Sequence, residues 1–255
     1  MSLVEISGLA RQFGGLQALS DFSFHIEAGE LVGLIGPNGA GKTTVFNIVS
    51  GFYKPTSGSV VFDGKRIDGL KPHQITALGM ARTFQNIRLW NSMSVLDNLR
   101  LASSAWLDYN FWGAILRTPR YRQAEKDIER HAHEILEIME LTDYAAELPA
   151  NLPYGLQRRV ELARALTSKP RLLLLDEPAA GLNCADVDDF IRQVRWIHDR
   201  FKLSIWMIEH QMKVVTALCQ RLTVIDFGCV IATGTPGEIQ NHPGVIKAYL
   251  GDATL

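Results

Sequence analysis

Residues 31–44 read LVGLIGPNGAGKTT, a short apolar run followed by the complete pattern G-x-x-x-x-G-K-[ST]. The apolar run predicts a buried parallel strand, and no helix breaker follows the pattern before Gly51, so the predicted context is strand, loop, helix. In such a loop, backbone N–H groups and the helix N-terminus hold phosphates. The predicted phosphate-binding residues are Gly36, Pro37, Asn38, Gly39, Ala40, Gly41, Lys42, Thr43 and Thr44.

The carboxylates that such a site needs stand at the end of a second apolar run, residues 172–175. Lys42 is expected to reach the β- and γ-phosphates, and the Thr43 hydroxyl is expected to bind Mg²⁺. Asp176 is placed to support the same Mg²⁺, and Glu177 follows at the carboxyl end of the strand, where it can activate a water. The alternatives are a glycine-rich turn that matches by accident, and two acids that merely end a strand and cap the next helix.

The composition limits the class of protein. The chain has 255 residues, of which 47% are hydrophobic and 21% charged, and a net charge of −1 gives no long-range attraction to nucleic acid. No apolar run approaches the length of a membrane-spanning helix, and we expect no secretory leader at the N-terminus. Cys184, Cys219 and Cys229 lack metal-ligand spacing, so we expect reduced thiols in an intracellular protein.

Periodic patterns predict an α/β fold with a mainly parallel sheet. Apolar and polar residues alternate at 22–27, as in an antiparallel strand, and Asp63-Gly64 predicts a hairpin turn. Three later apolar runs alternate with helical patterns, which favours parallel strands. One long helical stripe consists of Ile128, Ala132, Ile135, Leu136 and Met139. We expect one domain, residues 1–255, in which a nucleotide-binding core with an antiparallel β part (1–84 and 168–255) is interrupted by a helical subdomain (85–167).

With these motifs the chain resembles the ATP-binding-cassette (ABC) ATPases, and the resemblance covers essentially the whole sequence. It implies that Phe13 stacks on adenine, that Gln85 contacts the metal and the water, and that His210 contacts the γ-phosphate. The implied catalytic residues are Glu177, His210 and Gln85. The implied Mg²⁺ ligands are Thr43, Gln85 and Asp176. Taken singly, Phe13 could be a core residue and the other two ordinary polar residues, but their order along the chain matches the family.

The signature segment departs from the family pattern Leu-Ser-Gly-Gly-Gln, which contacts the ATP held by the opposite subunit. The aligned residues are Leu152, Pro153, Tyr154, Gly155 and Leu156, followed by Gln157. One charge-assisted hydrogen bond to phosphate is lost, at a cost of about 1.5–3 kcal/mol to the partner's site. We hypothesise an asymmetric heterodimer, in which the partner supplies a better signature to this chain's own P-loop. Asn183 also replaces the aspartate that is usual in the loop 180–183 between the two nucleotide sites.

Segments 117–120, 152–155, 178–183 and 248–251 are similar to the first of the two ATPases in branched-chain amino-acid importers. This resemblance implies a second ABC ATPase subunit as partner, as a heterodimer in vivo, with a homodimer open to the isolated chain. It also implies two integral membrane permease subunits, an indirect link to a solute-binding protein and no nucleic acid. The expected location is peripheral, at the cytoplasmic face of the inner or plasma membrane. The implied function is to couple ATP binding and hydrolysis to the uptake of branched-chain (hydrophobic) amino acids.

Other interpretations remain open at this point. The cargo could be another small solute, such as urea or amides, or the chain could be a soluble ABC ATPase of the iron–sulfur-cluster-assembly type. DNA-repair cassettes are disfavoured because the sequence has no coiled-coil heptads or basic stripe. A P-loop kinase would not need Gln85, His210 or a signature helix. The aromatic residues Trp106, Tyr109, Phe111 and Trp112 are expected to pack in a core rather than to face another subunit.

Overall fold

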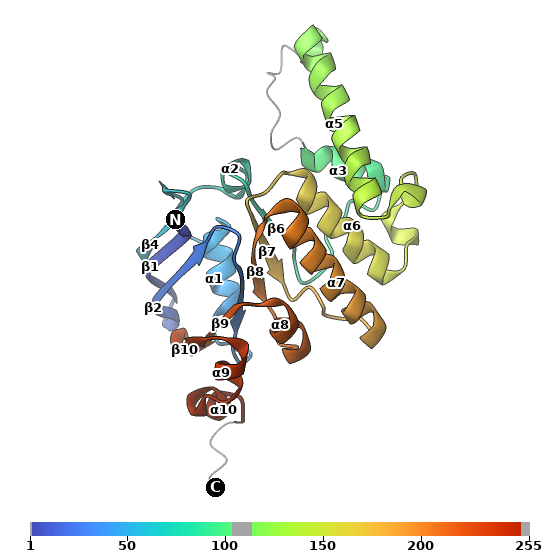
Figure 1. Ribbon diagram of the computed structural model, residues 1–255. Helices are drawn as coiled ribbons and strands as arrows, with labels where there is room; N and C mark the ends of the chain where they lie inside the picture. Colours follow the sequence, from blue (N-terminus) through green and yellow to red (C-terminus); the bar gives the residue numbers. More distant parts are fainter. Residues whose placement is uncertain (1, 104–113, 251–255) are drawn as a thin grey trace.

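The computed structural model describes residues 2–103 and 114–250, and Figure 1 shows their arrangement. The strands are β1 (Ser2–Phe13), β2 (Leu16–Glu27), β3 (Leu31–Ile35), β4 (Ser57–Phe62), β5 (Lys65–Arg66), β6 (Met80–Arg82), β7 (Leu172–Asp176), β8 (Ser204–Ile208), β9 (Arg221–Asp226) and β10 (Cys229–Gly234). The helices are α1 (Lys42–Val49), α2 (Pro72–Ala77), α3 (Val95–Ser103), α5 (Pro119–Ile138), α6 (Tyr154–Thr167), α7 (Cys184–Phe201), α8 (Met212–Leu218), α9 (Pro236–Gln240) and α10 (Pro243–Leu250), with short 3₁₀ turns η2 (Thr142–Tyr144) and η3 (Pro149–Asn151). The four aromatic residues at 106–112 lie outside the described residues.

Within the described residues the strands form two sheets. The smaller sheet has the order β2-β1-β4-β5 and is antiparallel. The larger sheet has the order β10-β9-β3-β8-β7-β6, and its strands are parallel except for the edge strand β10. The mainly parallel sheet and the antiparallel β part are therefore confirmed, whereas the short strand β6 and the antiparallel strand β10 were not predicted. The proposed division at residues 84/85 and 167/168 stays a prediction.

Helix α1 lies between the two sheets (Figure 1), and its apolar side chains join their facing surfaces into one core. The alternation predicted for β2 is present, because Phe22, Phe24 and Ile26 are buried and the residues between them are exposed. Trp206 of β8 is fully buried, and it stacks on Phe24 with ring centroids 4.7 Å apart. Trp206 also contacts Phe46 of α1 edge to face, with ring centroids 5.0 Å apart. These aromatic contacts join α1 to the larger sheet and the larger sheet to strand β2 of the smaller one.

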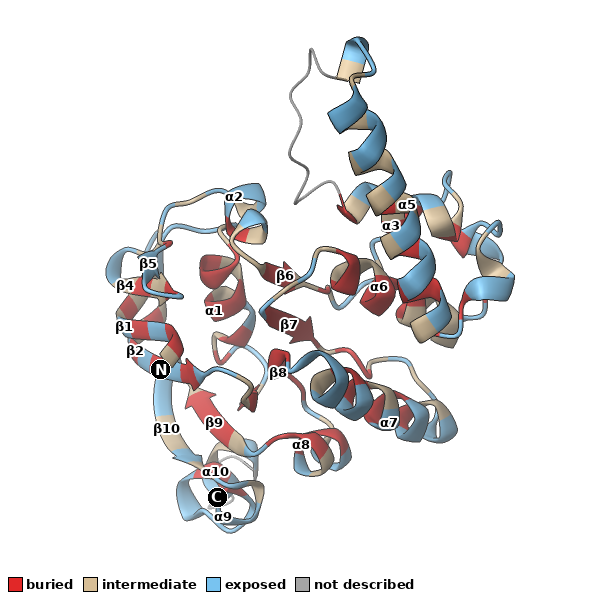
Figure 2. Ribbon diagram, turned by 45° about the horizontal axis from the view of Figure 1, so that its top comes forward, coloured by how far each residue is buried: buried red, intermediate tan, exposed pale blue. Residues whose placement is uncertain are grey.

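The opposite face of the larger sheet packs against α6, α7 and α8 in a second core. Figure 2 shows that these helices turn buried residues toward the sheet and exposed residues toward solvent. Helix α5 projects away from the body, and the stripe predicted for it is buried. None of the helices within the described residues is both long enough and apolar enough to cross a membrane.

The topology of the larger sheet positions the site. Strands β3, β8 and β7 are neighbours and run parallel, so their carboxyl ends meet at one edge. The loops that follow them are residues 36–41, 209–211 and 177–183, which carry the motifs selected from the sequence. Because ligands of open α/β sheets bind outside the carboxyl ends of the strands, this edge is where a site is expected.

Candidate functional site

The loop between β3 and α1 has a backbone that requires glycine at two positions. Gly36 has a φ of 153°, and a Cβ atom there would lie 2.1 Å from the carbonyl oxygen of Ile225. Gly41 has a φ of 105°, and a Cβ atom would lie 2.7 Å from the carbonyl oxygen of Ala18. The loop is thus wedged between the end of β9 and the strand β2, which keeps its backbone curved in front of the helix N-terminus.

Lys42 is the first residue of α1, and its ammonium lies inside this loop. Its Nζ donates to the carbonyl oxygens of Gly36 (2.7 Å) and Pro37 (2.8 Å), and the residue is only 7% exposed. Burial lowers the pKa of the ammonium from its usual value, while the carboxylates of Glu177 and Asp176 act in the opposite direction. The two halves of the predicted site are therefore close enough to interact electrostatically.

An open cleft of about 370 Å³ runs along the loop. Its lining residues include Phe13, Leu16, Gln17, Ala18, residues 38–44, Glu177 and Phe227. The Phe13 ring at the end of β1 contacts Tyr53 edge to face at 5.3 Å, and the Arg11 guanidinium lies 4.5 Å from the ring centroid. Phe13 thus borders the same cleft as Lys42, as adenine stacking requires. Phe227, at the exposed β9–β10 turn, also reaches this cleft and was missed by sequence reasoning, because nothing marks a turn aromatic as part of a remote site.

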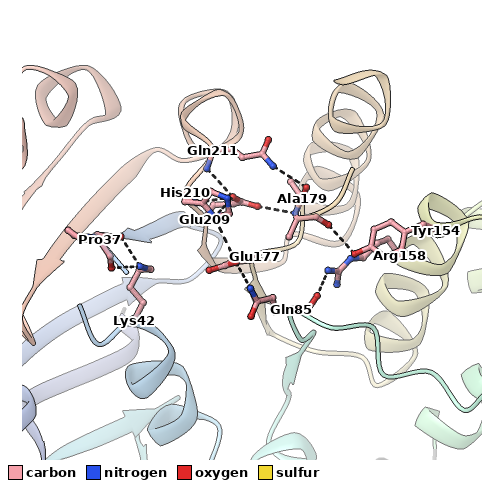
Figure 3. Close-up of polar contacts among 12 residues, drawn as sticks. Pro37, Lys42, Gln85, Tyr154, Arg158, Glu177, Ala179, Glu209, His210 and Gln211 are labelled. Atoms are coloured by element: carbon pink, nitrogen blue, oxygen red, sulfur yellow. Dashed lines mark hydrogen bonds and ion pairs between the residues drawn. The ribbon is translucent and has the colours of Figure 1, made fainter. Parts of the chain in front are cut away.

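Three predicted catalytic residues meet at one carboxylate. Gln85 Nε2 donates to Glu177 Oε2 at 2.7 Å, and His210 Nδ1 lies 3.8 Å from the same oxygen (Figure 3). Glu177 leaves strand β7 with a left-handed φ of 46°, and its N–H donates to the Ile208 carbonyl at 2.9 Å. This contact ties the backbone of Glu177 to the end of β8.

Asp176 has a partner that sequence reasoning missed. Arg82 at the end of β6 donates to Asp176 Oδ2 at 2.7 Å, and both side chains are almost fully buried (6% and 7% exposed). The same guanidinium donates to Asn47 Oδ1 (2.9 Å) and Ser50 Oγ (2.7 Å) at the end of α1. Burial lowers the pKa of Arg82, and Asp176 opposes that shift. The only sequence signal for this role was a charge directly after two apolar strand residues.

The predicted Mg²⁺ ligands Thr43, Gln85 and Asp176 line one cleft of about 350 Å³. A hydroxyl, an amide and a carboxylate are the hard oxygen donors that Mg²⁺ prefers, and this ion commonly uses one or two carboxylates together with substrate phosphates. The described residues contain no cluster of three His, Cys, Asp or Glu side chains that would form a protein-only metal cage. The donor set therefore fits Mg²⁺ that arrives with a nucleotide.

The predicted signature residues form the start of α6. Pro153 occupies the N-cap position, its carbonyl accepts from the Gln157 N–H at 3.0 Å, and Gln157 Nε2 donates back to the Leu152 carbonyl at 2.8 Å. The Tyr154 hydroxyl donates to the Ala180 carbonyl at 3.0 Å. The segment thus has a regular helical N-terminus in spite of its altered residues, and one of them contacts the loop after Glu177.

The loop after Glu177 is held by Asn183, which the sequence had singled out, and by Glu209, which it had not. Asn183 caps α7, because its side chain accepts from the N–H groups of Ala185 (2.9 Å) and Asp186 (3.0 Å). The alternative that Asp176 and Glu177 cap this helix is therefore wrong. Glu209, next to His210, is fully buried and accepts from the Ala179 N–H at 2.9 Å.

Comparison with known proteins adds independent observations. The family model described as ABC transporter matches residues 19–180, and one described as branched-chain amino acid ATP-binding cassette transporter matches residues 229–254. The chain is 43% identical to the high-affinity branched-chain amino acid transport ATP-binding protein BraF of Pseudomonas aeruginosa, with 98% of both chains covered. It is 41% identical to LivG of Escherichia coli K12 over 98% of both chains, and 34% identical to a probable LivG of Archaeoglobus fulgidus over 98% and 96%.

Solved structures show the same architecture. The ADP conformation of MJ1267, an ATP-binding cassette of an ABC transporter, superimposes with a TM-score of 0.84 and is 28% identical, with 99% of this chain and 100% of that chain covered. A nucleotide-free ATP-binding cassette from an ABC transporter gives a TM-score of 0.85 at the same identity and coverage. The predicted α/β P-loop fold is thereby confirmed.

Proposed function

This chain belongs to the ABC transporter family as an ATP-binding subunit, and we propose that it couples ATP binding and hydrolysis to the import of branched-chain amino acids. Two observations support the cargo. The relatives named for branched-chain amino acid transport are 41–43% identical over nearly the whole chain, and the C-terminal family model of that name matches residues 229–254.

The observation that carries the catalytic part of the proposal is the convergence of Lys42, Glu177, Gln85 and His210 at one edge of the sheet. Lys42 exchanges its carbonyl partners for oxygens of the β- and γ-phosphates, which the loop N–H groups also bind. Glu177 accepts a proton from the attacking water, and the Gln85 amide keeps that carboxylate oriented. His210 contacts the γ-phosphate.

The remaining predicted residues bind and orient the nucleotide. Phe13 stacks on adenine at the far end of the cleft. Thr43, Asp176 and Gln85 would hold Mg²⁺, which when bound neutralises charge on the β- and γ-phosphates. Arg82 keeps Asp176 Oδ2 occupied, so the carboxylate has a defined orientation toward the cleft.

The assembly follows from the family. We infer a second ABC ATPase subunit and two membrane-embedded permease subunits as partners, with a solute-binding protein acting through the permeases. The chain then lies peripherally at the cytoplasmic face of the membrane. Its signature segment at the start of α6 faces the nucleotide held by the second ATPase subunit.

The test combines nucleotide binding with transport. K42A should lose measurable MgATP binding in equilibrium dialysis and lose ATPase activity, because the loop loses its only ammonium, whereas K65A on the exposed strand β5 serves as the control. Vesicles that contain the reconstituted importer should take up labelled leucine on addition of ATP and should not take up urea. Unchanged nucleotide binding by K42A would refute the proposal, and uptake of urea alone would refute its cargo.

A further inference from the structure

The segment Ala179–Ala180 has all of its main-chain polar groups bonded. The Ala179 N–H donates to Glu209 Oε1 at 2.9 Å, and its carbonyl accepts from Gln211 Nε2 at 3.0 Å. The Ala180 N–H donates to the Glu177 carbonyl at 3.1 Å, and its carbonyl accepts from the Tyr154 hydroxyl at 3.0 Å. A loop with every backbone group satisfied in this way is fixed relative to each of its partners. Figure 3 shows the side chains that surround it.

One anchor of this segment is Glu209. Its side chain is fully buried, and its second oxygen accepts from the N–H groups of His210 (2.8 Å) and Gln211 (3.1 Å). A single carboxylate therefore binds three main-chain amides from two segments. A buried carboxylate is stabilised by hydrogen bonds of this kind, and Glu209 Oε1 loses its main-chain donor if the segment that carries Ala179 moves away.

The other anchor is Tyr154 of the signature helix. Its ring lies beside the loop, because a Cβ atom built on Gly181 would come within 3.4 Å of the ring. The Arg158 guanidinium lies 5.6 Å from the ring centroid and donates to the backbone carbonyls of Phe84 (2.8 Å) and Gln85. The tyrosine is thus connected on one side to the loop after Glu177 and on the other side to the segment that carries Gln85.

We propose that Tyr154 and Glu209 are positioning residues that make segment 179–181 a rigid connection between this chain's signature helix and its own Glu177 and His210. A glycine at position 154, as in the family pattern, has no group that could donate to Ala180. Tyr154 therefore places an anchor on the neighbouring loop at a position where the family pattern has a flexible glycine. This inference depends on the proposed function, because its consequence is that nucleotide bound across the dimer interface against the signature sets the geometry of hydrolysis in this chain.

The first experiment uses Y154F, which removes only the hydroxyl and keeps the ring beside Gly181. In the full-length chain, hydrogen–deuterium exchange at residues 178–183 should accelerate by about 2- to 10-fold, as expected for loss of one hydrogen bond. In the assembled ATPase pair, kcat should fall while KM for ATP is unchanged, and cooperativity between the two sites should decrease. Y144F is the control, because it removes the hydroxyl of a partly buried tyrosine in the turn η2, which is not part of segment 179–181.

The second variant is E209Q, which replaces one acceptor oxygen with an NH₂ group that faces backbone N–H groups. It should accelerate exchange at 178–183 and also at 209–211, while E147Q at an exposed glutamate should change neither. Unchanged exchange and unchanged cooperativity in both Y154F and E209Q would overturn the inference, even if K42A behaves as the proposed function requires. Normal nucleotide binding by K42A would instead refute the proposed function itself.

Discussion

Asp176 forms a buried ion pair with Arg82. Their ion pair is 2.7 Å long, and the Arg82 guanidinium also binds the side chains of Asn47 and Ser50. Removing one partner of a buried ion pair leaves the other charge uncompensated, which typically costs about 3–5 kcal/mol. This is a large fraction of the free energy of unfolding of a typical domain. Arg82 therefore stabilises the fold and orients a predicted metal ligand at the same time.

We expect R82M to lower the free energy of unfolding by about 3–5 kcal/mol, as measured by urea denaturation. The free energy of unfolding of R82K should lie between those of R82M and the wild type, because an ammonium keeps the charge but cannot reproduce the forked geometry of the guanidinium. R192M is the control, since the Arg192–Asp189 pair lies on the exposed face of α7. If R82M lowers the free energy of unfolding no more than R192M does, Arg82 does not have the stabilising role assigned to it.

The role of a residue could be predicted from the sequence wherever the chemistry of the site allows only one or two residue types. The glycines and Lys42 of the loop, and the pair Asp176-Glu177, stand out because few other residues can perform those tasks. Arg82 and Glu209 were not predictable, because their roles depend on which strands become neighbours. Their partners are 94 and 30 residues away in the sequence, and no local pattern encodes such distances.

Helix α5 illustrates electrostatics at the scale of one element. His131 and His133 are two residues apart, so they face different directions, and their side chains are 17% and 51% exposed. Burial lowers the pKa of His131 from its usual value of 6.5, and the nearby Lys169 adds to this effect, while Glu134 opposes it. The folded chain therefore binds a proton at this site less readily than the unfolded chain.

This depressed pKa predicts a pH dependence with a defined sign. Above pH 6.5 both states are neutral at His131, so the full stability is present; as the pH falls through 6.5 and then through the lower folded-state pKa, the unfolded state gains the proton first and stability is lost. H131L should lose less thermal stability than the wild type between pH 8 and pH 5.5, as followed by circular dichroism. H133L is the control for loss of a histidine, and an equal acid sensitivity of H131L and the wild type would contradict the prediction.

Helices and strands with a long apolar pattern were predicted more reliably than short ones. The alternation in β2, the helical stripe in α5 and the apolar runs in β7 and β8 all appear where the sequence placed them. Strand β6 has three residues, which is too short to show a period, and β10 is half exposed at the sheet edge. Such strands form because a neighbouring strand offers hydrogen bonds, and that information is not local.

At the scale of the whole molecule, the altered signature predicts an asymmetric dimer. In the assembled pair, we expect E177Q to lower ATP turnover by about 100-fold or more, because it removes the proposed general base from the site that, in our hypothesis, has the better signature. Changing the partner's matching glutamate should have a smaller effect, since that site already lacks a signature contact. Single-turnover assays on the two mutant complexes measure both effects. If E177Q leaves turnover near wild type while the partner's change abolishes it, the assignment of the sites is reversed.

The pairing of β3 has a consequence for how the protein is made. Both neighbours of this strand, β8 and β9, come from residues 204–226, so a newly synthesised chain carries an unpaired apolar strand until most of it has left the ribosome. Non-local pairing of this kind is slow and leaves strand edges open to aggregation. The strand that leads into the proposed nucleotide-binding loop is therefore unpaired during much of translation, when it can aggregate.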